Sequence, residues 1–504
     1  MQGEVYDLAI VGGGINGAGI AADAAGRGLK VVLFEKGDLG GGTSSASSKL
    51  IHGGLRYLEH FEFRLVRESL AEREVLLARA PHLIRPLRFV IPHTWGMRPL
   101  SLLRFGLFLY DRLAPRQKIL ASDSVDLSRD PMGRPLRPEF KAGLSYYDCW
   151  VDDARLVVLT ALDAAERGAR IHTRAPVTRI AHAGDTWEVT AETAVGSTTV
   201  AARAVVNAGG PWCADVAALA SHAADVPTLR LVRGSHIVVP RIDGAEDAYL
   251  LQARDKRAVF ALPFEKQFTL IGTTDAPVST PEEGFIPSAE EESYLLEAAA
   301  RFFARKITHE DIVWRFAGVR PLVDDGASKA AAVSRDYRLD LANGDGAPPL
   351  LNIIGGKITT FRRLAEAALE KLAPYFPGMG PAWTADAPLP GGDVGTRGFA
   401  AYCSDLARRH PNMAQSTLLR LAGLYGTRAD RVLGDARTEA DLGEVIGGGL
   451  TAREVRYLCD HEWARTAEDV LWRRTKAGLH LSPADRTRAE ATLTFLIAGR
   501  LGHA

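Results

Sequence analysis

The chain has 504 residues, which at roughly 150 residues per domain predicts two to four folding units. Lys and Arg together number 61, as do Asp and Glu, so the formal net charge is zero and gives no reason to expect nucleic acid as a partner. The four cysteines are widely separated in sequence, which argues against a disulfide framework or a cysteine-based zinc site. We expect no metal site.

The sequence gives no sign of a membrane span or a leader. No stretch reaches about 18 uninterrupted apolar residues, so we expect any membrane contact to be peripheral. The N-terminal residues carry neither a basic stretch nor an apolar one before the first strand pattern begins. We therefore expect the protein to stay in the cytosol.

The first motif predicts a dinucleotide site. A β-rich run leads into Gly12-x-Gly14-x-x-Gly17, and an alanine-rich helical stretch follows. This order allows a tight turn, a close approach of backbone to a pyrophosphate, and close helix packing at the third glycine. A second strand pattern ends at Glu35, 18 positions beyond Gly17 (35 − 17), where a carboxylate accepts hydrogen bonds from ribose hydroxyls.

The fingerprint alone leaves NAD and FAD open, because both present a pyrophosphate to the same turn. Residues 204–210 and 351–357 are two further strands that run into glycines. Three junctions of this kind in one chain favour a flavin fold over a lone NAD module.

The middle of the chain predicts an antiparallel sheet. Several strand patterns follow one another between residues 229 and 274 without intervening helices. A proline and glycine cluster at 388–392 interrupts the pattern, and the chain beyond it is helical. We expect a domain boundary there.

Three helix starts carry recognisable capping signals. Residues 288–291 form a capping box before a helix that we expect to run to about residue 305. Residues 451–454 form a second capping box. Ser482 and Pro483 predict an N-cap followed by the first helical position.

Residues 98–118 form the most apolar stretch of the chain, with arginines at both ends. Its apolar residues lie almost all round a helix, which is typical of a buried helix. The alternative is an interfacial element whose flanking cations reach anionic lipid or a quinone.

Further motifs follow one another along the chain, at residues 12–19, 43–58, 150–156, 233–236, 271–275, 318–322, 355–360, 460–463 and 471–475. Together they resemble FAD-dependent aerobic sn-glycerol-3-phosphate dehydrogenases of the bacterial type. The resemblance covers nearly the whole chain, which makes it more specific than any single motif.

The resemblance implies an α/β plus α+β architecture with three parts. These are a glutathione-reductase-type FAD-binding Rossmann domain, a substrate-binding domain with an antiparallel sheet, and a C-terminal all-helical cap. The expected boundaries are 1–80, 150–225 and 319–387 for the FAD domain, 81–149 and 226–318 for the substrate domain, with a candidate membrane segment at 98–118, and 388–504 for the cap.

The resemblance also implies an activity and partners. The expected reaction oxidises sn-glycerol 3-phosphate to dihydroxyacetone phosphate by hydride transfer from C2 to FAD N5. Electrons then pass to a membrane quinone, and the enzyme is a peripheral homodimer on the cytoplasmic face of the inner membrane.

Cofactor contacts are expected from the fingerprint, the Ser/Thr-rich run at 43–48 and the later glycine junctions. The predicted FAD-binding residues are Gly12, Gly14, Ile15, Asn16, Gly17, Glu35, Lys36, Thr43, Ser44, Ser45, Ser48, Lys49, Leu50, His52, Gly53, Gly54, Val177, Gly209, Trp212, Gly356, Lys357 and Thr359.

The substrate side needs cations for a phosphate and a base for a hydroxyl proton. Arg56, Arg320 and Lys357 lie in the matching motifs beside glycines, and an arginine fork fits phosphate geometry. His236 is the first candidate base, because an imidazole titrates in the useful range; a structural strand histidine is the alternative. Tyr57 and Thr274 are candidate hydrogen-bond partners of the substrate.

Three other functions use the same motifs. A glycerol-3-phosphate oxidase would pass electrons to O2 and release H2O2. An amino-acid or amine oxidase would need a carboxylate site and would ignore phosphorylated substrates. A non-catalytic flavoprotein would have no need of Arg56, Arg320 and Lys357 together, which argues against it.

Overall fold

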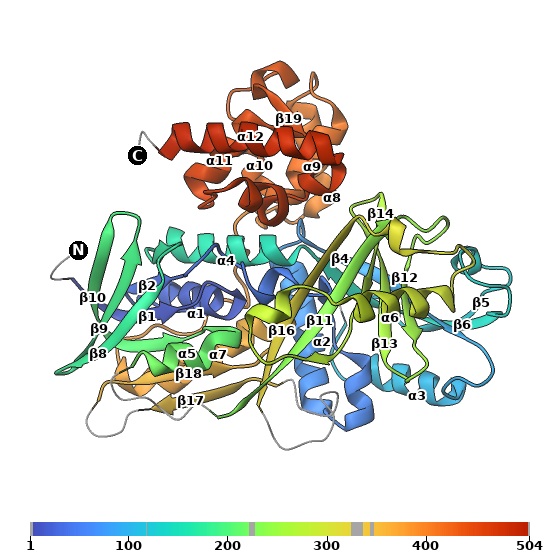
Figure 1. Ribbon diagram of the computed structural model, residues 1–504, viewed down its shortest axis with the longest axis horizontal. Helices are drawn as coiled ribbons and strands as arrows, with labels where there is room; N and C mark the ends of the chain where they lie inside the picture. The colour runs from blue at the N-terminus through green and yellow to red at the C-terminus, as the bar shows by residue number, and fades with distance from the viewer. Residues whose placement is uncertain (1–3, 117, 221–226, 324–335, 343–346, 502–504) are drawn as a thin grey trace.

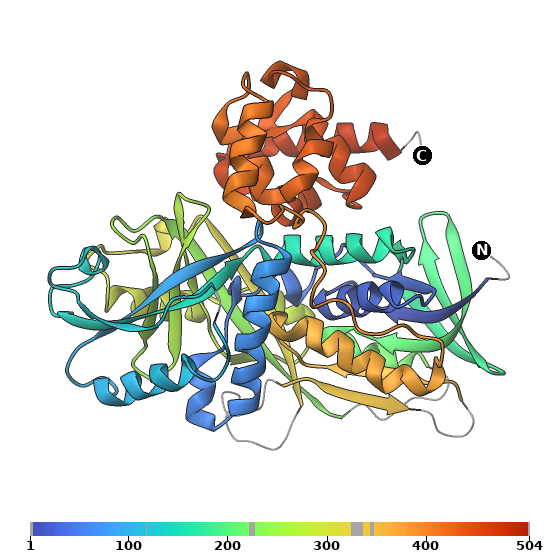
Figure 2. The same cartoon turned by 180° about the vertical axis from the view of Figure 1, so that it is seen from behind.

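The computed structural model describes residues 4–116, 118–220, 227–323, 336–342 and 347–501. Two large sheets lie side by side, and the C-terminal helices stack on one side of the molecule, above α4 (Figure 1). The view from behind shows α4, α1 and α7 as one helical layer beside the first sheet (Figure 2). The architecture predicted from the sequence is confirmed.

The first sheet carries the predicted βαβ unit at its centre. Its strand order is β17-β18-β10-β1-β2-β7, and β1 pairs in parallel with both β2 and β10. Apolar side chains on one face of the central strands pack against the helical layer, and those on the other face pack against β8 and β9. This explains why the strand sequences are apolar on both faces. The strands are β1 (Val5–Val11), β2 (Val31–Phe34), β7 (Arg170–His172), β8 (Val177–Ala183), β9 (Thr186–Thr193), β10 (Gly196–Asn207), β17 (Arg338–Ala342) and β18 (Leu350–Ile354).

Small side chains allow α1 to pack closely between its neighbours. An alanine-rich sequence gives α1 high helix propensity and lets α4 and α7 approach. A Cβ at Gly19 would lie 2.8 Å from the ring of Phe361 in α7. The helices that flank the two sheets are α1 (Ile15–Gly26), α2 (Phe63–Arg79), α4 (Asp153–Glu166), α5 (Cys213–Ala218), α6 (Ala289–Ala300) and α7 (Phe361–Leu372).

The second sheet is almost wholly antiparallel, as predicted. Its strand order is β15-β11-β14-β13-β12-β4-β6-β3, with β16 beside β11 and β5 beside β6. Within the described part of the chain, only the β12–β4 pair of this sheet is parallel. The strands are β3 (Leu50–Ile51), β4 (Ile84–His93), β5 (Asp123–Asp126), β6 (Ala142–Val151), β11 (Leu229–Pro240), β12 (Ala248–Gln252), β13 (Ala258–Phe264), β14 (Phe268–Gly272), β15 (Ala276–Pro277) and β16 (Trp314–Val323).

Two strands from segments expected in the FAD domain pair with the second sheet. Strand β3 lies in the 1–80 segment assigned to the FAD domain but pairs with β6 of the second sheet. Strand β16 pairs with β11 along its full length, although its last residues fall within the 319–387 segment. These two strands bring residues of both sheets to one place.

The C-terminal unit is helical with one small ribbon of two strands. Its helices enclose a separate apolar core. Its elements are α8 (Gly398–Arg409), α9 (Gln415–Tyr425), α10 (Ala429–Leu433), α11 (Ala452–His461), a π-helical segment (Asp469–Arg474), α12 (Pro483–Leu501), β19 (Val445–Gly447) and β20 (Leu450–Thr451).

The three helix starts have different outcomes. The capping box of Ser288 is present, although α6 ends at Ala300 and not near residue 305. The prediction of a capping box at Thr451 is wrong. The Thr451 side chain makes no capping hydrogen bond, and the carboxylate of Glu454 accepts hydrogen bonds from Arg420 and Tyr425. Ser482 does cap α12, since its Oγ accepts from the backbone N–H of Asp485 at 3.2 Å.

Helix α3 (Leu100–Tyr110) is not the buried helix that its composition favours. Leu102, Phe105 and Phe108 are each about half exposed, and only Leu107 and Tyr110 are buried. The helix lies on the side of the molecule away from the C-terminal unit (Figures 1 and 2). Among the described residues, no helix has the length and apolar content needed to cross a membrane.

Candidate functional site

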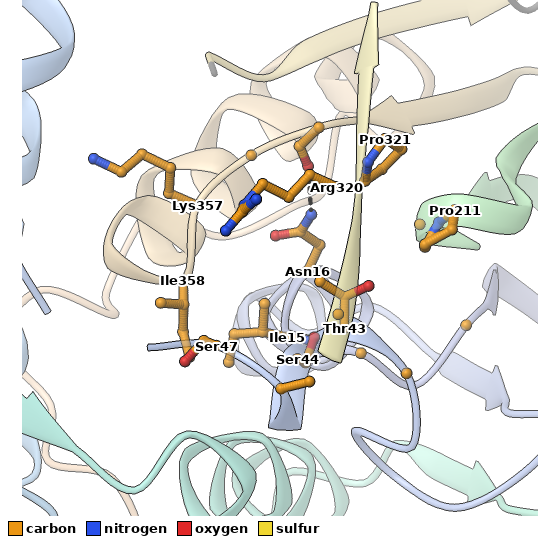
Figure 3. Close-up of a pocket in the computed structure, with 18 of the residues that line it drawn as sticks. Ile15, Asn16, Thr43, Ser44, Ser47, Pro211, Arg320, Pro321, Lys357 and Ile358 are labelled. Carbon is orange, nitrogen blue, oxygen red and sulfur yellow. Dashed lines mark hydrogen bonds between the residues drawn. The ribbon is translucent and has the colours of Figure 1, made fainter. Parts of the chain in front are cut away.

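One cavity of about 650 Å³ runs between the two sheets. The turn after β1, the segment 41–48, β16 and the segment after β18 all line it. Figure 3 shows Thr43 and Ser44 beside Ile15 at the start of α1, with Arg320 reaching in from β16 and Lys357 extending away from them. Its size falls within the range of ligand sites in proteins.

The glycine-rich turn has no room for side chains. Gly12 has φ +114°, and a Cβ there would lie 2.4 Å from the carbonyl oxygen of Ala208. A Cβ at Gly17 would lie 1.9 Å from the carbonyl oxygen of Gly12. The backbone of this turn can therefore come close to a ligand at the N-terminus of α1, which suits an anion.

Glu35 closes one end of this turn. Its carboxylate accepts hydrogen bonds from the backbone N–H groups of Gly13 at 2.6 Å and Gly37 at 2.7 Å. Burial raises the pKa of Glu35 above its ordinary value, and the two amides act in the opposite direction. An acidic side chain at the end of β2 is where a dinucleotide places its ribose hydroxyls.

The Ser/Thr-rich run is held by the protein. Thr43 Oγ1 donates to the carbonyl of Val319 at 2.6 Å, and Ser44 Oγ accepts from the backbone N–H of Ile15 at 3.0 Å. Lys49 is fully buried in an ion pair with Asp153 at 2.7 Å. The run is therefore a fixed wall of the cavity and not a solvated loop.

A flavin dinucleotide fits these residues. Asn16 Nδ2 donates to the carbonyl of Gly355 at 3.1 Å, while its buried Oδ1 has no partner among the described residues. That oxygen lies on the cavity wall beside the glycine turn and can accept a hydrogen bond from a ligand. The glycine turn suits a pyrophosphate, Glu35 suits the ribose hydroxyls, and this acceptor suits a polar group of a second ring system. Together they fit a flavin dinucleotide.

The other end of the cavity holds cations around one carboxylate. Arg320 Nη1 lies 3.1 Å from Asp275 Oδ1, and Arg56 Nη1 lies 3.9 Å from Asp275 Oδ2. Both arginine side chains are about a quarter exposed. Lys357 Nζ donates to Ser69 Oγ at 3.2 Å and lies 4.6 Å from the ring centre of Tyr57. This end is suited to an anionic group.

Two histidines lie near the cations, His236 buried and His52 half-buried, and both are neutral near pH 7. Burial, with smaller effects of Lys357 and Arg73, lowers the pKa of His52 to about 3. Burial and the charges of Arg320 and Lys49 hold the pKa of His236 well below its ordinary value. Only His52 lines the cavity; His236 Nε2 lies 2.9 Å from Ser48 Oγ, which does.

Comparisons with known proteins agree with this geometry. Residues 7–362 match the family described as FAD dependent oxidoreductase, and residues 382–499 match the C-terminal domain of alpha-glycerophosphate oxidase. The chain belongs to the FAD-dependent oxidoreductases. Its cofactor is FAD.

Within that family, this chain is similar to dehydrogenases named for phosphorylated polyols. It is 52% identical to a glycerol-3-phosphate dehydrogenase of Pseudomonas aeruginosa, over 96% of this chain and 94% of the relative. It is 50% identical to a D-erythritol 1-phosphate dehydrogenase of Brucella abortus, over 96% of each chain. The crystal structure of a Bacillus halodurans glycerol-3-phosphate dehydrogenase complexed with FAD superposes with a TM-score of 0.77, at 26% identity, covering 99% of this chain and 95% of that one.

Most predicted site residues line the cavity of this oxidoreductase. Seven do not, although each lies next to the wall. Gly17, Gly53 and Gly54 pack against neighbouring protein atoms, Ser45 and Lys49 face away, and His236 and Thr274 lie behind lining residues. Those that line it are Gly12, Gly14, Ile15, Asn16, Glu35, Lys36, Thr43, Ser44, Ser48, Leu50, His52, Arg56, Tyr57, Val177, Gly209, Trp212, Arg320, Gly356, Lys357 and Thr359.

The side chain of Thr274 forms hydrogen bonds within the protein and does not line the cavity. Its Oγ1 accepts from the backbone N–H of Ser235 at 2.9 Å and donates to Glu291 at 2.5 Å. The neighbouring Thr273 and Asp275 line the cavity instead, because successive residues point to opposite sides of an extended segment.

Sequence reasoning missed several lining residues. Asp275 lies in the matched motif 271–275, so the motif could have pointed to it. Phe260 has the pattern of an ordinary core strand and carried no signal. Arg473 lies in the matched motif 471–475, and Glu468 carried no signal. Both belong to the C-terminal unit, and only the tertiary structure brings them to the cavity.

Proposed function

We propose that this FAD-dependent oxidoreductase oxidises sn-glycerol 3-phosphate to dihydroxyacetone phosphate. The observation that carries the proposal is the pair of arginines, Arg56 and Arg320, at the end of the cavity away from Glu35. Two relatives are 52% and 50% identical to this chain, and both are named as dehydrogenases of a phosphorylated polyol. Their names support the same substrate class.

Each proposed role follows from the side chain's place. When bound, FAD accepts a hydride from the carbon that is oxidised. Arg56 and Arg320 hold the substrate phosphate, and Tyr57 and Lys357 flank the same end of the cavity. Asp275 holds the two arginines at one place, and binding of a dianion displaces this contact in part.

We propose His236 as the acceptor of the hydroxyl proton, with Ser48 as the relay. The neutral imidazole has a free electron pair to accept a proton, and Ser48 Oγ lies between it and the cavity. A bound dianionic phosphate would raise the pKa of His236 from its depressed value, because it offsets the charge of Arg320.

We also propose that the electron acceptor is a membrane quinone and that the enzyme is a peripheral homodimer at the cytoplasmic face of the inner membrane. The resemblance to peripheral membrane enzymes supports both statements. The half-exposed Leu102, Phe105 and Phe108 on α3 add an apolar surface for a bilayer, with Arg104 and Arg112 beside them for anionic headgroups.

D-erythritol 1-phosphate is a second candidate substrate. The 50% identical Brucella abortus relative carries that name, and its identity to this chain is close to that of the glycerol-3-phosphate dehydrogenase. The two substrates share a phosphate and differ by one hydroxymethylene group, so both suit a site built around two arginines.

The test is anaerobic mixing of the FAD-loaded protein with each substrate while the flavin absorbance near ~450 nm is followed. We expect bleaching by sn-glycerol 3-phosphate faster than by D-erythritol 1-phosphate, and none by glycine. Faster bleaching by the erythritol phosphate would make it the substrate, and bleaching by glycine alone would overturn the phosphate assignment. Adding a ubiquinone analogue or O2 to the reduced protein then identifies the acceptor, with H2O2 as the mark of an oxidase.

A further inference from the structure

The segment 468–474 of the C-terminal unit reaches the cofactor cavity. Glu468 and Arg473 line the cavity together with Glu35 and Asp38. The substrate roles proposed above use none of these C-terminal residues. The matched motif 471–475 therefore needs a separate explanation.

Arg473 is held in one orientation by three carboxylates. Its Nε donates to Asp38 Oδ2, its Nη1 to Glu468 Oε1 and its Nη2 to Asp469 Oδ1, each at 2.6 Å. The neighbouring Arg474 is fully buried and donates to both oxygens of Asp38 at 2.7 Å. Two guanidinium groups of the C-terminal unit thus bind the carboxylate of Asp38.

Asp38 belongs to the short loop that positions Glu35. In this loop the backbone N–H of Gly37 donates to Glu35, and the carbonyl of Gly37 accepts from the backbone N–H of Arg174 at 2.8 Å. The Arg174 side chain in turn donates to Asp469 at 2.7 Å. The C-terminal unit therefore holds this loop at two points.

The cations keep Asp469 charged. Burial raises its pKa, but the backbone N–H of Arg465 and the charges of Arg174 and Arg473 outweigh burial and lower the pKa to about 2. The ion pair between Arg473 and Asp469 consequently persists throughout the neutral range.

This end of the cavity is the adenosine end. Glu35 lies at the end of β2, where the ribose of a dinucleotide binds. Trp212 and Val177 line the same end, and Lys36 Nζ lies 3.5 Å from the ring centre of Trp212. Arg320 and Lys357 line the opposite end.

We propose that Glu468 and Arg473 form the outer wall of the adenosine part of the FAD site, and that Arg473 is a positioning residue for Glu35. The C-terminal unit then takes part in cofactor binding as well as covering the fold. The inference requires FAD as the cofactor and is independent of which substrate is oxidised.

The test compares the two halves of the cofactor. FAD is removed from the full chain, and the apoprotein is titrated with FAD, with ADP as the adenosine half and with FMN as the flavin half. For Arg473→Met we expect the dissociation constants of FAD and ADP to rise about tenfold, since the loop that positions Glu35 loses the charge-assisted contact between Arg473 and Asp38. We expect that of FMN to stay within about twofold of the wild-type value.

Two milder variants keep the test valid where Arg473→Met does not fold. Arg473→Lys keeps a charge without the three-way fork and should raise the ADP dissociation constant by less than Arg473→Met. Glu468→Gln changes an exposed wall residue and should raise it about threefold, with the melting temperature of the apoprotein unchanged. The matched control is Arg488→Met, because the Arg488 and Asp485 pair lies on the surface of α12 and outside the cavity.

Two outcomes would overturn the proposal. One is wild-type affinity for ADP in both Arg473→Lys and Glu468→Gln. The other is an equal loss of ADP and FMN binding together with a lower melting temperature of the apoprotein, which would mean that Arg473 only stabilises the fold.

Discussion

At the scale of single residues, the glycine turn leaves no space for a methyl group at Gly17. For Gly17→Ala, overpacking against the carbonyl of Gly12 should lower the stability by at least about 1–3 kcal/mol. Because that carbonyl belongs to the turn that faces the cofactor, the variant should also lose most of its FAD. Flavin content per chain and the melting temperature measure both effects.

Gly106→Ala is the control for this substitution. Nothing lies within 4 Å of a Cβ at Gly106, which is inside α3, so the flavin content should match the wild type and the stability should be equal to it or higher by up to about 1 kcal/mol. A fully loaded and equally stable Gly17→Ala protein would contradict the steric argument.

Arg320 should affect the reaction without affecting the cofactor. Arg320→Met removes a charge-assisted contact to phosphate worth about 1.5–3 kcal/mol, so kcat/KM for flavin reduction by sn-glycerol 3-phosphate should fall by about 10- to 100-fold. Flavin content should stay the same. Arg315→Met is the control, since Arg315 is on the same strand, is half exposed, pairs with Glu292 and does not line the cavity. Equal kcat/KM in the two variants would remove Arg320 from the phosphate site.

His82 should make the fold sensitive to acid. Burial lowers its pKa from 6.5 to about 3, and neither ring nitrogen has a partner among the described residues. Between these two values the unfolded chain binds a proton that the folded chain excludes, so stability falls as the pH decreases below 6.5 and is unaffected above it.

The measurement for His82 is urea unfolding of the FAD-loaded protein at pH 7, 6 and 5. His82→Gln removes the titrating group. The free energy of unfolding of the wild type should therefore decrease by about 1.4 kcal/mol per pH unit more than that of the variant, once the pH is below 6. Parallel pH profiles would show that His82 does not titrate with unfolding.

At the scale of elements, α3 exposes large apolar side chains, whereas an ordinary surface helix exposes polar ones. Replacing Leu102, Phe105 and Phe108 together with Ser removes three large apolar groups, each worth about 1.5–3 kcal/mol when buried. If these groups insert only partly into a bilayer, the triple variant should bind vesicles about 100-fold more weakly than the wild type, or weaker still. Sedimentation with anionic phospholipid vesicles measures it.

Phe495→Ser provides the comparison, because Phe495 is exposed on α12 in the C-terminal unit, away from α3. It should bind vesicles as the wild type does. Unchanged sedimentation of the triple α3 variant, with normal flavin content, would remove α3 as the membrane contact.

At the scale of the whole molecule, buried ion pairs join the C-terminal unit to α4. Arg155 and Glu462 are fully buried and form a bidentate pair across the interface. Glu462→Gln leaves Arg155 buried without its counter-charge, which should cost about 3–5 kcal/mol. In calorimetry we expect the C-terminal unit to melt separately at a lower temperature.

The pair Glu166 and Arg428 joins the same two parts and serves as the control, because Glu166 is exposed whereas Glu462 is fully buried. Glu166→Gln should cost about 0–1 kcal/mol, because water screens the exposed carboxylate. Similar losses in the two variants would show that burial does not set the strength of this interface.

The sequence by itself determined the elements whose signals are local. The fingerprint Gly12-x-Gly14-x-x-Gly17 predicted the turn, the helix and the dinucleotide site, because close approach of backbone atoms excludes side chains whatever the rest of the fold does. The three-part architecture and the cofactor followed from such junctions and from the motif resemblance.

Only the tertiary structure decided which residues meet. Composition favoured burial of α3, but burial depends on what the fold places against a helix, and the described chain places little there. Thr274 and Asp275 share one motif, yet the chain between β14 and β15 turns one into the protein and the other into the cavity. Arg473 reaches the cofactor end from 435 positions beyond Asp38 (473 − 38), and no local pattern encodes a contact between groups so far apart in sequence.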